Sequence, residues 1–406
     1  MKSNYKMLGN YIQIVDERNR GGEIDYLLGV SINKQFIPSI ANIVGTDLSN
    51  YKIVRTGQFA YGPVTSRNGE KISIALLKDK DCIISSSYTV FEVINKEELD
   101  PEYLMLWFSR PEFDRYARYM SHGSVREIFG WDEMCKVELP VPPIEKQRSI
   151  VKAYQTITDR IALKKKINDN LVHEINMIYH RWFNEFLSPY ANSERYYTEL
   201  GNIPIGWKVA ELGDYIESFS KSHSFGKEKL IFLNTSDILA GDFLNNTYMP
   251  VVNMPGQAKK QIAQGDILFS EIRPANKRYA LVTFPADDYV VSTKLMVLRT
   301  TQCELSNLRI YHYLTMEKTL DELHREADGK SGTFPQITFD ENLRHRKFVV
   351  ADEETEKHFE KLLVAYFALE EKIRKEIKSL SDASAIILNG LSRLIVIFKG
   401  DCYGTK

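Results

Sequence analysis

Cations and amides are concentrated in a few short loops of this sequence, and these side chains define the chemistry that it offers. The stretch 273–278 (Arg-Pro-Ala-Asn-Lys-Arg) carries three cations and an amide within six residues. Lys and Arg contact phosphates, Arg also pairs with guanine, and Asn or Gln pairs with adenine, so loops holding both types suit DNA. Surface loops are often polar only because they are solvated, and that simpler interpretation stays open for each residue.

Further stretches share this composition, and together they define the predicted DNA contacts. In the N-terminal half they are 65–71 and 123–126, with 34–35 as a third, weaker patch. In the C-terminal half they are 221–229, 273–278 and 330–336. The individual candidates are Lys34, Gln35, Arg67, Asn68, Lys71, Ser124, Arg126, Lys221, His223, Lys227, Lys229, Arg273, Asn276, Lys277, Arg278, Lys330, Ser331, Thr333 and Gln336.

The sequence lacks the motifs of the common catalytic and cofactor sites. The stretch Val141-Pro142-Pro143-Ile144 has neither the Asn or Asp nor the aromatic residue that amino-methyltransferases place around a Pro-Pro pair. There is no Gly-x-x-x-x-Gly-Lys-Ser/Thr phosphate loop, no Gly-x-Gly-x-x-Gly and no Gly-x-Ser-x-Gly elbow. The eight histidines show no His-x-x-x-His spacing, and the four cysteines form no Cys-x-x-Cys pair. We therefore expect a non-catalytic chain with no metal or cofactor of its own.

The balance of charge limits the kind of nucleic-acid binding. With 53 Lys and Arg against 54 Asp and Glu, the formal net charge is −1. A near-neutral chain does not coat nucleic acid indiscriminately, although local basic patches are compatible with it. The first twenty residues contain no apolar segment of a signal peptide, and no run of about 18 apolar residues occurs. We expect a soluble, cytoplasmic protein of two or three domains.

A long amphipathic helix, predicted over 144–188, separates the N-terminal loops from the C-terminal ones. No Gly or Pro interrupts it. At a rise of 1.5 Å per residue, roughly 40 residues would make a rod of about 60 Å, whose single apolar stripe needs a partner helix. Its heptad seam has a polar break near the middle, and its positions are Ile150, Tyr154, Ile157, Ile161, Lys164, Asn168, Leu171, Ile175, Ile178 and Trp182.

A second seam lies 209 residues further along, at Phe359, Leu363, Tyr366, Glu370, Ile373, Ile377, Leu380, Ser384, Ile387 and Leu391. Two helices of matching length and phase indicate a duplicated chain in which they pair as an antiparallel coiled coil. Two unrelated amphipathic helices are the alternative. The polar seam residues either fix the register of the pair or face a partner subunit or water.

The segments before the two helices follow one plan. Short β-rich runs punctuated by Gly, Asn, Asp and Pro lead to one predicted helix, 101–120 or 305–325, and then to a Gly-containing loop. The motif Leu-Gly-Asn-Tyr-Ile at 8–12 returns as Leu-Gly-Asp-Tyr-Ile at 212–216, and further landmarks recur in order at offsets of 204 to 209. We predict an α+β fold built by tandem duplication: β-rich domains 1–143 and 189–352, spacer helices 144–188 and 353–398, and a tail 399–406.

Two like domains at the ends of an antiparallel helix pair would be related by a pseudo-twofold axis and held at a fixed separation. Half-sites on one face of DNA lie about 34 Å per turn apart, so a bipartite DNA target suits this geometry best. A coiled-coil scaffold whose domains bind proteins is the alternative, and it predicts no salt-sensitive DNA binding. An enzyme with an unrecognised site is the third interpretation.

The sequence resembles the specificity (S) subunit of Type I restriction–modification enzymes. The motifs that carry the resemblance are 139–147 (Leu-Pro-Val-Pro-Pro-Ile-Glu-Lys-Gln), 202–207 before Leu212-Gly213, 265–270 with Ile272-Arg273-Pro274, and 332–337. Two places depart from the family pattern. The first half begins at 6–9 (Lys-Met-Leu-Gly) without a Pro-x-Gly-Trp leader, and 349–352 (Val-Val-Ala-Asp) stands where a second Pro-Pro pair is expected.

The resemblance covers essentially the whole chain and implies a specific biology. Each β-rich domain would be a target-recognition domain that reads one half of a bipartite double-stranded DNA sequence. The helices would fix the gap between the halves and dock two modification (methyltransferase) subunits, which carry S-adenosylmethionine and methylate adenine. A restriction and translocase subunit that uses ATP and Mg would join for cleavage. The S subunit itself would have no active site.

Overall fold

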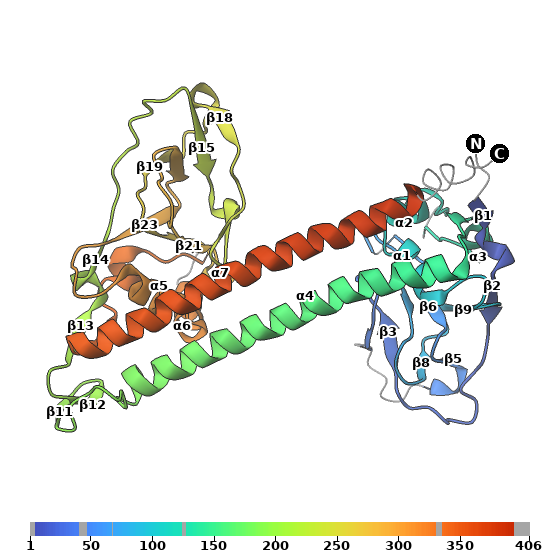
Figure 1. The fold of residues 1–406 in the computed structure, drawn as a ribbon, viewed down its shortest axis with the longest axis horizontal. Coiled ribbons are helices and arrows are strands. Elements are labelled where there is room, and N and C mark those ends of the chain that lie inside the picture. The colour runs from blue at the N-terminus through green and yellow to red at the C-terminus, as the bar shows by residue number, and fades with distance from the viewer. Residues whose placement is uncertain (1–4, 40–46, 67, 124–126, 330–334, 394–406) are drawn as a thin grey trace, which may run out of the picture. The chain divides into compact units, whose positions relative to one another are not determined.

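The computed structural model describes residues 5–39, 47–66, 68–123, 127–329 and 335–393. The chain divides into two compact units, of which unit 1 comprises residues 1–165 and 374–406 and unit 2 comprises residues 166–373. Each unit contains one β-rich domain and a segment of each of two long helices (Figure 1). The packing of a domain on the helices can therefore be described within each unit.

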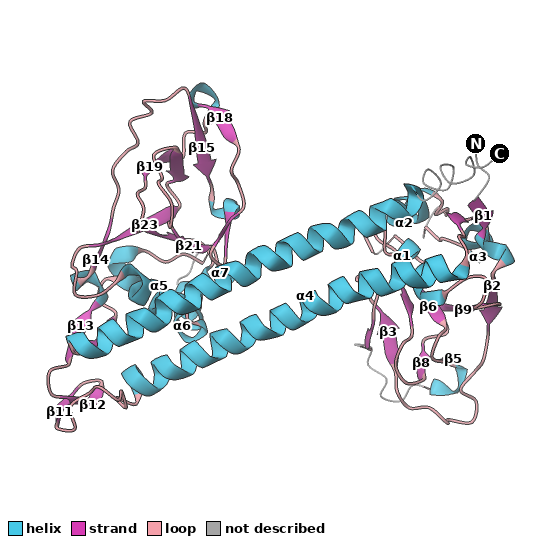
Figure 2. Ribbon diagram, viewed as in Figure 1, coloured by secondary structure: helices cyan, strands magenta, loops and turns pink. Residues whose placement is uncertain are grey.

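The domain of unit 1 is built on a four-stranded antiparallel sheet in the order β2-β9-β6-β7, of which β2, β9 and β6 are labelled in Figure 2. Phe59 and Phe91 are opposite each other on this sheet, with ring centroids 4.8 Å apart, and Phe108 from α1 (Pro101–Phe108) packs edge-on against both. The strands of unit 1 are β1 (Tyr5–Met7), β2 (Ile12–Val15), β3 (Leu28–Val30), β4 (Phe36–Pro38), β5 (Lys52–Val54), β6 (Phe59–Tyr61), β7 (Ile74–Leu76), β8 (Cys82–Ile84), β9 (Thr89–Val93) and β10 (Glu138–Pro140).

The helix predicted over 101–120 is two helices, α1 (Pro101–Phe108) and α2 (Pro111–Tyr119), and α3 (Trp131–Cys135) follows. Asp100 caps α1 by accepting a hydrogen bond from the Tyr103 amide, and Pro101 occupies the first turn. Pro111 ends any continuous helix because it has no amide hydrogen and its ring clashes with the preceding turn. A proline visible in the sequence therefore corrects the single-helix prediction.

Unit 2 contains the corresponding sheet, β14-β23-β20-β21, and a second four-stranded sheet, β18-β15-β22-β19, in which β15 and β22 are parallel. The second sheet forms its own apolar clusters around Val291 and Leu230. The strands are β11 (Arg195–Thr198), β12 (Gly201–Pro204), β13 (Lys208–Glu211), β14 (Ile216–Ser218), β15 (Lys229–Leu233), β16 (Ile238–Leu239), β17 (Asp242–Phe243), β18 (Tyr248–Pro250), β19 (Ala258–Gln261), β20 (Ile267–Ser270), β21 (Tyr279–Leu281), β22 (Tyr289–Ser292), β23 (Leu295–Thr300) and β24 (Lys347–Val350).

The helix predicted over 305–325 is also divided, into α5 (Asn307–Thr315) and α6 (Glu317–Asp328). Met316 between them has an extended backbone, with φ −59° and ψ 139°. The break lets both helices turn apolar faces to one core, which contains Ile310 and Leu314 from α5 and Leu320 and Leu323 from α6. The helical period of the sequence continues across Met316, so the pattern alone did not reveal this boundary.

The Leu-Gly motif that opens each domain has the same structural role in both units. The Leu8 amide donates to the Val137 carbonyl oxygen over 2.8 Å, and the Leu212 amide donates to that of Arg346 over 2.9 Å. A Cβ atom added at Gly9 would lie 2.8 Å from Cys135, and one added at Gly213 would lie 2.7 Å from Arg344. Glycine is needed at both sites because the chain passes too close for a side chain. Together with the equal strand order of the two sheets, this establishes the duplication.

The long helices are α4 (Ile144–Tyr179) and α7 (Glu353–Gly390). α4 ends in a π-helical turn, His180–Asn184, instead of continuing to 188, and α7 ends in a 3-10 turn, Leu391–Arg393; the predicted end at 398 and the tail lie outside the described residues. All twenty predicted seam positions are buried or half-buried. In unit 1 Glu376 pairs with Arg160 and with Lys164, and in unit 2 Phe359 packs on Tyr179. Regular coiled-coil packing along their length stays a prediction.

Charge reversal at Glu376 tests the interhelical pairing in unit 1. Glu376→Lys would bring three cations together, so we expect the thermal midpoint to fall by a few degrees and the deficit to shrink in high salt. Asp382→Lys, an exposed position further along α7, is the matched control. The measurement is thermal unfolding at low and high salt, and equal midpoints for the two variants would show that the contact does not help to hold the helices together.

Candidate nucleic-acid interface

The described flanks of two loops predicted to contact DNA in the first domain pair with each other in unit 1. An antiparallel bridge joins Val64 to Ile128, and the Thr65 amide donates to the Glu127 carbonyl oxygen over 3.0 Å. The Thr65 hydroxyl, which is buried, donates to the Ser121 hydroxyl over 2.9 Å. The flanks of loops 65–71 and 121–128 therefore lie side by side and form one surface, although about fifty residues separate the two loops in the sequence.

The third predicted patch, Lys34 and Gln35, adjoins this surface but points partly inward. The Lys34 ammonium lies 2.5 Å from the Asp114 carboxylate and donates to the Ile72 carbonyl oxygen over 2.8 Å. Burial lowers the pKa of Lys34, and Asp114 opposes that effect. The Lys34 charge is thus already balanced by a largely buried ion pair, and its DNA contact stays a prediction. Gln35 and Lys71 are exposed, and Asn68 is half-buried.

The second domain presents the equivalent pair of loops in unit 2. A bridge joins Ile272 to Gln336, and the Arg273 amide donates to the Pro335 carbonyl oxygen over 3.1 Å. These contacts are those of Val64, Ile128 and Thr65 in unit 1, each displaced by 208 residues. The duplication therefore extends from the sheets to the loops chosen for their chemistry.

The loop 273–278 has an unusual backbone that exposes polar groups. Arg273 and Lys277 both adopt left-handed conformations, with φ of 49° and 53°, on either side of a 3-10 turn. Non-glycine residues in this region are strained, and such strain is concentrated at functional sites. Asn276 and Lys277 are exposed at the turn. Arg278 instead donates to the carbonyl oxygens of Ser236 and Ile238 over 3.1 and 3.0 Å, so its guanidinium is structural.

The stretch 221–229 lies beside the second sheet of unit 2. Ser222 bridges to Lys260, whose ammonium donates to the Leu295 carbonyl oxygen over 2.8 Å. Lys221 and Lys229 are exposed, whereas Lys227 pairs with Asp288. His223 is half-buried and its Nδ1 accepts a hydrogen bond from the Phe225 amide over 2.9 Å. Burial, with a smaller contribution from Lys227, lowers the pKa of His223, which favours the neutral ring.

Six of the predicted contacts lie outside the described residues: Arg67, Ser124, Arg126, Lys330, Ser331 and Thr333.

Two exposed residues next to the loops were not predicted. Tyr119 is 82% exposed at the end of α2, two residues before the loop 121–128, and Lys294 pairs with Glu271 beside Ile272. The sequence feature that could have identified Tyr119 is its position as an aromatic residue in the polar last turn of an amphipathic helix.

Comparison with known proteins assigns the fold to a family. The sequence profile of the Type I restriction modification DNA specificity domain matches twice, over residues 10–173 and 204–379. This chain belongs to that family. The two matched ranges each contain one β-rich domain and much of one long helix, so the family's own repeat coincides with the repeat seen in the hydrogen bonds.

Individual relatives cover only part of the chain. The Type I restriction enzyme HindI specificity subunit of Haemophilus influenzae is 39% identical over 168 residues, which are 41% of this chain and 36% of that protein. The MjaIX specificity subunit of Methanocaldococcus jannaschii is 29% identical over 184 residues, 42% of each chain. The matches thus span about two-fifths of these curated relatives.

A solved structure extends the likeness of fold to almost the full length. The crystal structure of a Type I restriction–modification S subunit from M. genitalium matches 96% of this chain and 95% of its own, with a TM-score of 0.58 at 13% identity. At that identity the likeness concerns the fold alone. Among the described residues, no helix is both long and apolar enough to span a membrane, and no group of three His, Cys, Asp or Glu side chains is placed to hold a metal ion.

Proposed function

We propose that this chain is the DNA sequence-recognition subunit of a Type I restriction–modification enzyme, in which each recognition domain reads one half of a bipartite target. The observation that carries the proposal is the repeated loop pair, because the same hydrogen bonds build it in both units. A duplicated reading surface is what a DNA target with two half-sites requires.

The chemistry of the exposed loop residues supports contact with DNA. In unit 1 the surface presents Gln35 and Lys71, and in unit 2 the turn 273–278 presents Asn276 and Lys277, while Lys221 is exposed beside the second sheet. Lysines supply phosphate contacts, which give affinity and salt dependence, whereas the amides can pair with adenine in the major groove. The described candidates whose charges are already satisfied, such as Lys34 and Arg278, would instead stabilise the loops that carry these groups.

The remaining parts of the proposed enzyme lie in other chains. The two long helices would set the spacing between half-sites and dock two modification subunits, which bind S-adenosylmethionine and methylate adenine. A restriction subunit using ATP and Mg would join the complex for cleavage, and the assembly would act in the cytoplasm. This chain itself would contribute recognition and no catalytic residue. The names of the relatives, which are specificity subunits of Type I restriction enzymes, support this division of labour.

Comparing the methylomes of cells with and without this gene tests the proposal directly. One split motif that contains adenine should gain methylation when the gene is present and lose it when the gene is deleted. In vitro, the complex with its modification subunits should bind that motif with an affinity that falls steeply with salt, by about 0.9 logarithmic units per phosphate contact for each tenfold rise in salt. An unchanged methylome together with salt-insensitive DNA binding would favour a protein-binding scaffold.

A further inference from the structure

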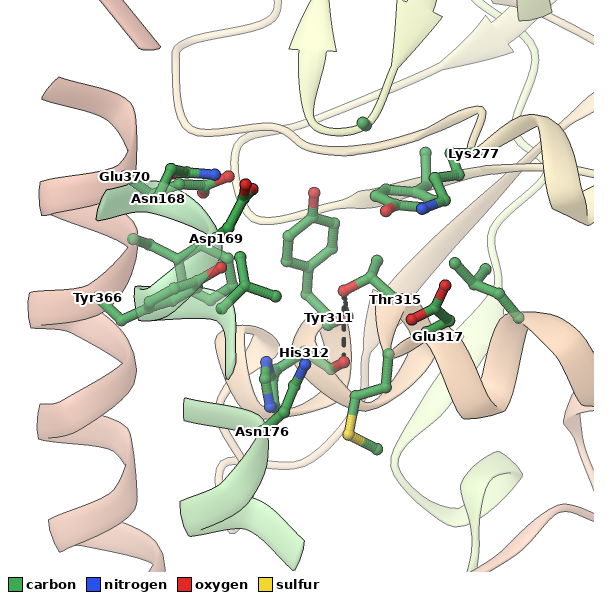
Figure 3. Close-up of a pocket in the computed structure, with 16 residues that line it drawn as sticks. Asn168, Asp169, Asn176, Lys277, Tyr311, His312, Thr315, Glu317, Tyr366 and Glu370 are labelled. Carbon is green, nitrogen blue, oxygen red and sulfur yellow. Dashed lines mark hydrogen bonds between the residues drawn. The ribbon is translucent and has the colours of Figure 1, made fainter. Parts of the chain in front are cut away.

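Unit 2 contains a cavity of about 430 Å³ where the end of α5 and the start of α6 meet α4 and α7 (Figure 3). Small-molecule and side-chain pockets in proteins measure roughly 300–1,000 Å³, so this one is large enough for a ligand group. The aromatic rings of Tyr279, Tyr311 and Tyr366 contribute to its wall, and the side chain of Tyr311 projects into the space between the helices.

The charged residues that line this cavity are mostly acidic. Asp169 from α4, Glu317 from α6 and Glu370 from α7 supply carboxylates, and Lys277 is the one lysine or arginine among the lining residues, all of which are described. The lining therefore has an excess of negative charge, which repels a DNA phosphate and attracts a cation.

Two buried polar atoms of the cavity lack hydrogen-bond partners. His312 is only 4% exposed and lines the cavity, and its Nε2 atom has no partner; the Oδ1 atom of Asn168 is likewise unpaired. Burial, together with the neighbouring Arg309, lowers the pKa of His312 to about 3, so the ring is neutral, and in the tautomer with the proton on Nδ1 its Nε2 atom accepts a hydrogen bond. Unsatisfied buried acceptors are costly, and a ligand with N–H donors would satisfy them.

The cavity at the equivalent place in unit 1, of about 530 Å³, has different chemistry. The Ser109 hydroxyl bonds to the Met105 carbonyl oxygen as the Thr315 hydroxyl bonds to that of Tyr311, both over 2.8 Å, which aligns α1 with α5. In that alignment Leu106 takes the place of His312. Two of the charged residues of the unit 1 cavity, Lys78 and Glu102, neutralise each other.

We propose that the cavity of unit 2 binds an organic cation rich in N–H donors, either a guanidinium or a primary amine. The carboxylates would compensate its charge, the tyrosine rings would add cation–π attraction, and His312 and Asn168 would accept its hydrogen bonds. The cation belongs either to an arginine side chain of a docked protein subunit or to a free polyamine. The first source rests on the proposed function, because that function supplies the docked subunit.

Calorimetric titration of the full chain with Nα-acetyl-arginine amide, and separately with spermidine, tests the proposal. We expect saturable binding of at least one probe, with a Kd on the order of 0.1–1 mM for a group of this size. The double variant Asp169→Asn, Glu317→Gln should weaken binding at least about tenfold. His312→Leu, which installs the unit 1 residue, should weaken it as well. Asp321→Asn, exposed on α6 and outside the cavity, is the matched control.

Both carboxylate substitutions are at exposed positions, so the double variant should fold even where His312→Leu does not. Failure of both probes to bind the wild-type chain, or equal binding to the double variant, would overturn the proposal. If the double variant also weakens assembly with the modification subunits, the cation is an arginine of that partner. If assembly is unchanged and spermidine binding is lost, the cation is a free polyamine. Sequence-specific DNA binding of the wild-type complex is measured in parallel. If the probes bind but sequence-specific DNA binding is absent, the proposed function is contradicted. If DNA is bound specifically but neither probe binds, only the cavity proposal is contradicted.

Discussion

Replacing Glu356 by Gln is expected to lower the free energy of unfolding by about 3–5 kcal/mol, because it leaves the buried Arg309 without a compensating charge. Arg309 is 1% exposed on α5, and its Nε atom lies 3.3 Å from the Glu356 carboxylate at the start of α7. The guanidinium also lies over the rings of Tyr179 and Phe183, 4.7 and 4.0 Å from their centroids. This cluster joins the second β-rich domain to both long helices within unit 2.

In unit 1 the equivalent junction between the domain and the long helix is held by neutral side chains instead of an ion pair. At the equivalent place the Tyr103 hydroxyl donates to the Pro140 carbonyl oxygen over 3.0 Å. The Gln147 amide donates to the carbonyl oxygens of Glu98 and Pro142 and accepts from the Asp100 amide. A neutral network can therefore occupy this junction, and replacing both members of a buried ion pair is often close to neutral. The double variant Arg309→Tyr, Glu356→Gln should recover most of the stability lost by Glu356→Gln.

Denaturant titration measures these changes, with Glu354→Gln as the matched control because Glu354 is exposed on the same turn of α7. The control should unfold within experimental error of the wild type. A Glu356→Gln protein that unfolds at the wild-type midpoint would contradict the role given to the ion pair, and so would a double variant no more stable than the single one.

The architecture could be predicted because its signals are periodic and local. A heptad seam depends only on residues three and four positions apart, so both long helices were visible in the sequence, with their polar breaks at Lys164 and Glu370. The Leu-Gly motifs repeat because Gly9 and Gly213 each meet another part of the chain too closely for a side chain. The divisions between α1 and α2 and between α5 and α6 were not predicted, because the apolar pattern continues across both breaks. Pro111 was the one residue in the sequence that indicated such a break.

The candidate site was less predictable because the state of each cation depends on distant partners. Lys34 points inward because of Asp114, eighty residues away, and Arg278 is held by carbonyl groups of the hairpin near Ile238. Composition does not distinguish such residues from Lys71 and Asn276, which are exposed. The pairing of the loops was also invisible, since the bridges of Val64 and Ile272 join segments more than sixty residues apart. Residue types therefore identify the candidate loops, but only the folded structure shows which side chains are exposed toward a ligand and which ones stabilise the loop.

Asn276→Asp is expected to abolish reading of one half of the bipartite target while leaving the other half intact. Asn276 is exposed on the strained turn between Arg273 and Lys277, where an amide can make two hydrogen bonds to adenine. The Asn amide donates one of these bonds to N7 and accepts the other from the N6 amino group. A carboxylate cannot donate the first bond and is repelled by the phosphates, so affinity for the specific site should fall at least about tenfold. Binding by the assembled complex, measured by fluorescence anisotropy, gives the affinity.

The methylome of the Asn276→Asp strain then distinguishes lost recognition from lost folding. If unit 2 reads one half-site through this turn, methylation of the original motif should fall, or the methylated sites should no longer share the bases of that half-site. The half-site read by unit 1 should keep its sequence in either case. Asn202→Asp adds the same charge at an exposed position of β12, away from the loops, and should change neither affinity nor motif. Equal loss from both variants would mean that the added charge acts through the general field of the protein. Loss of both half-sites together would mean that the turn supports the fold instead of reading DNA.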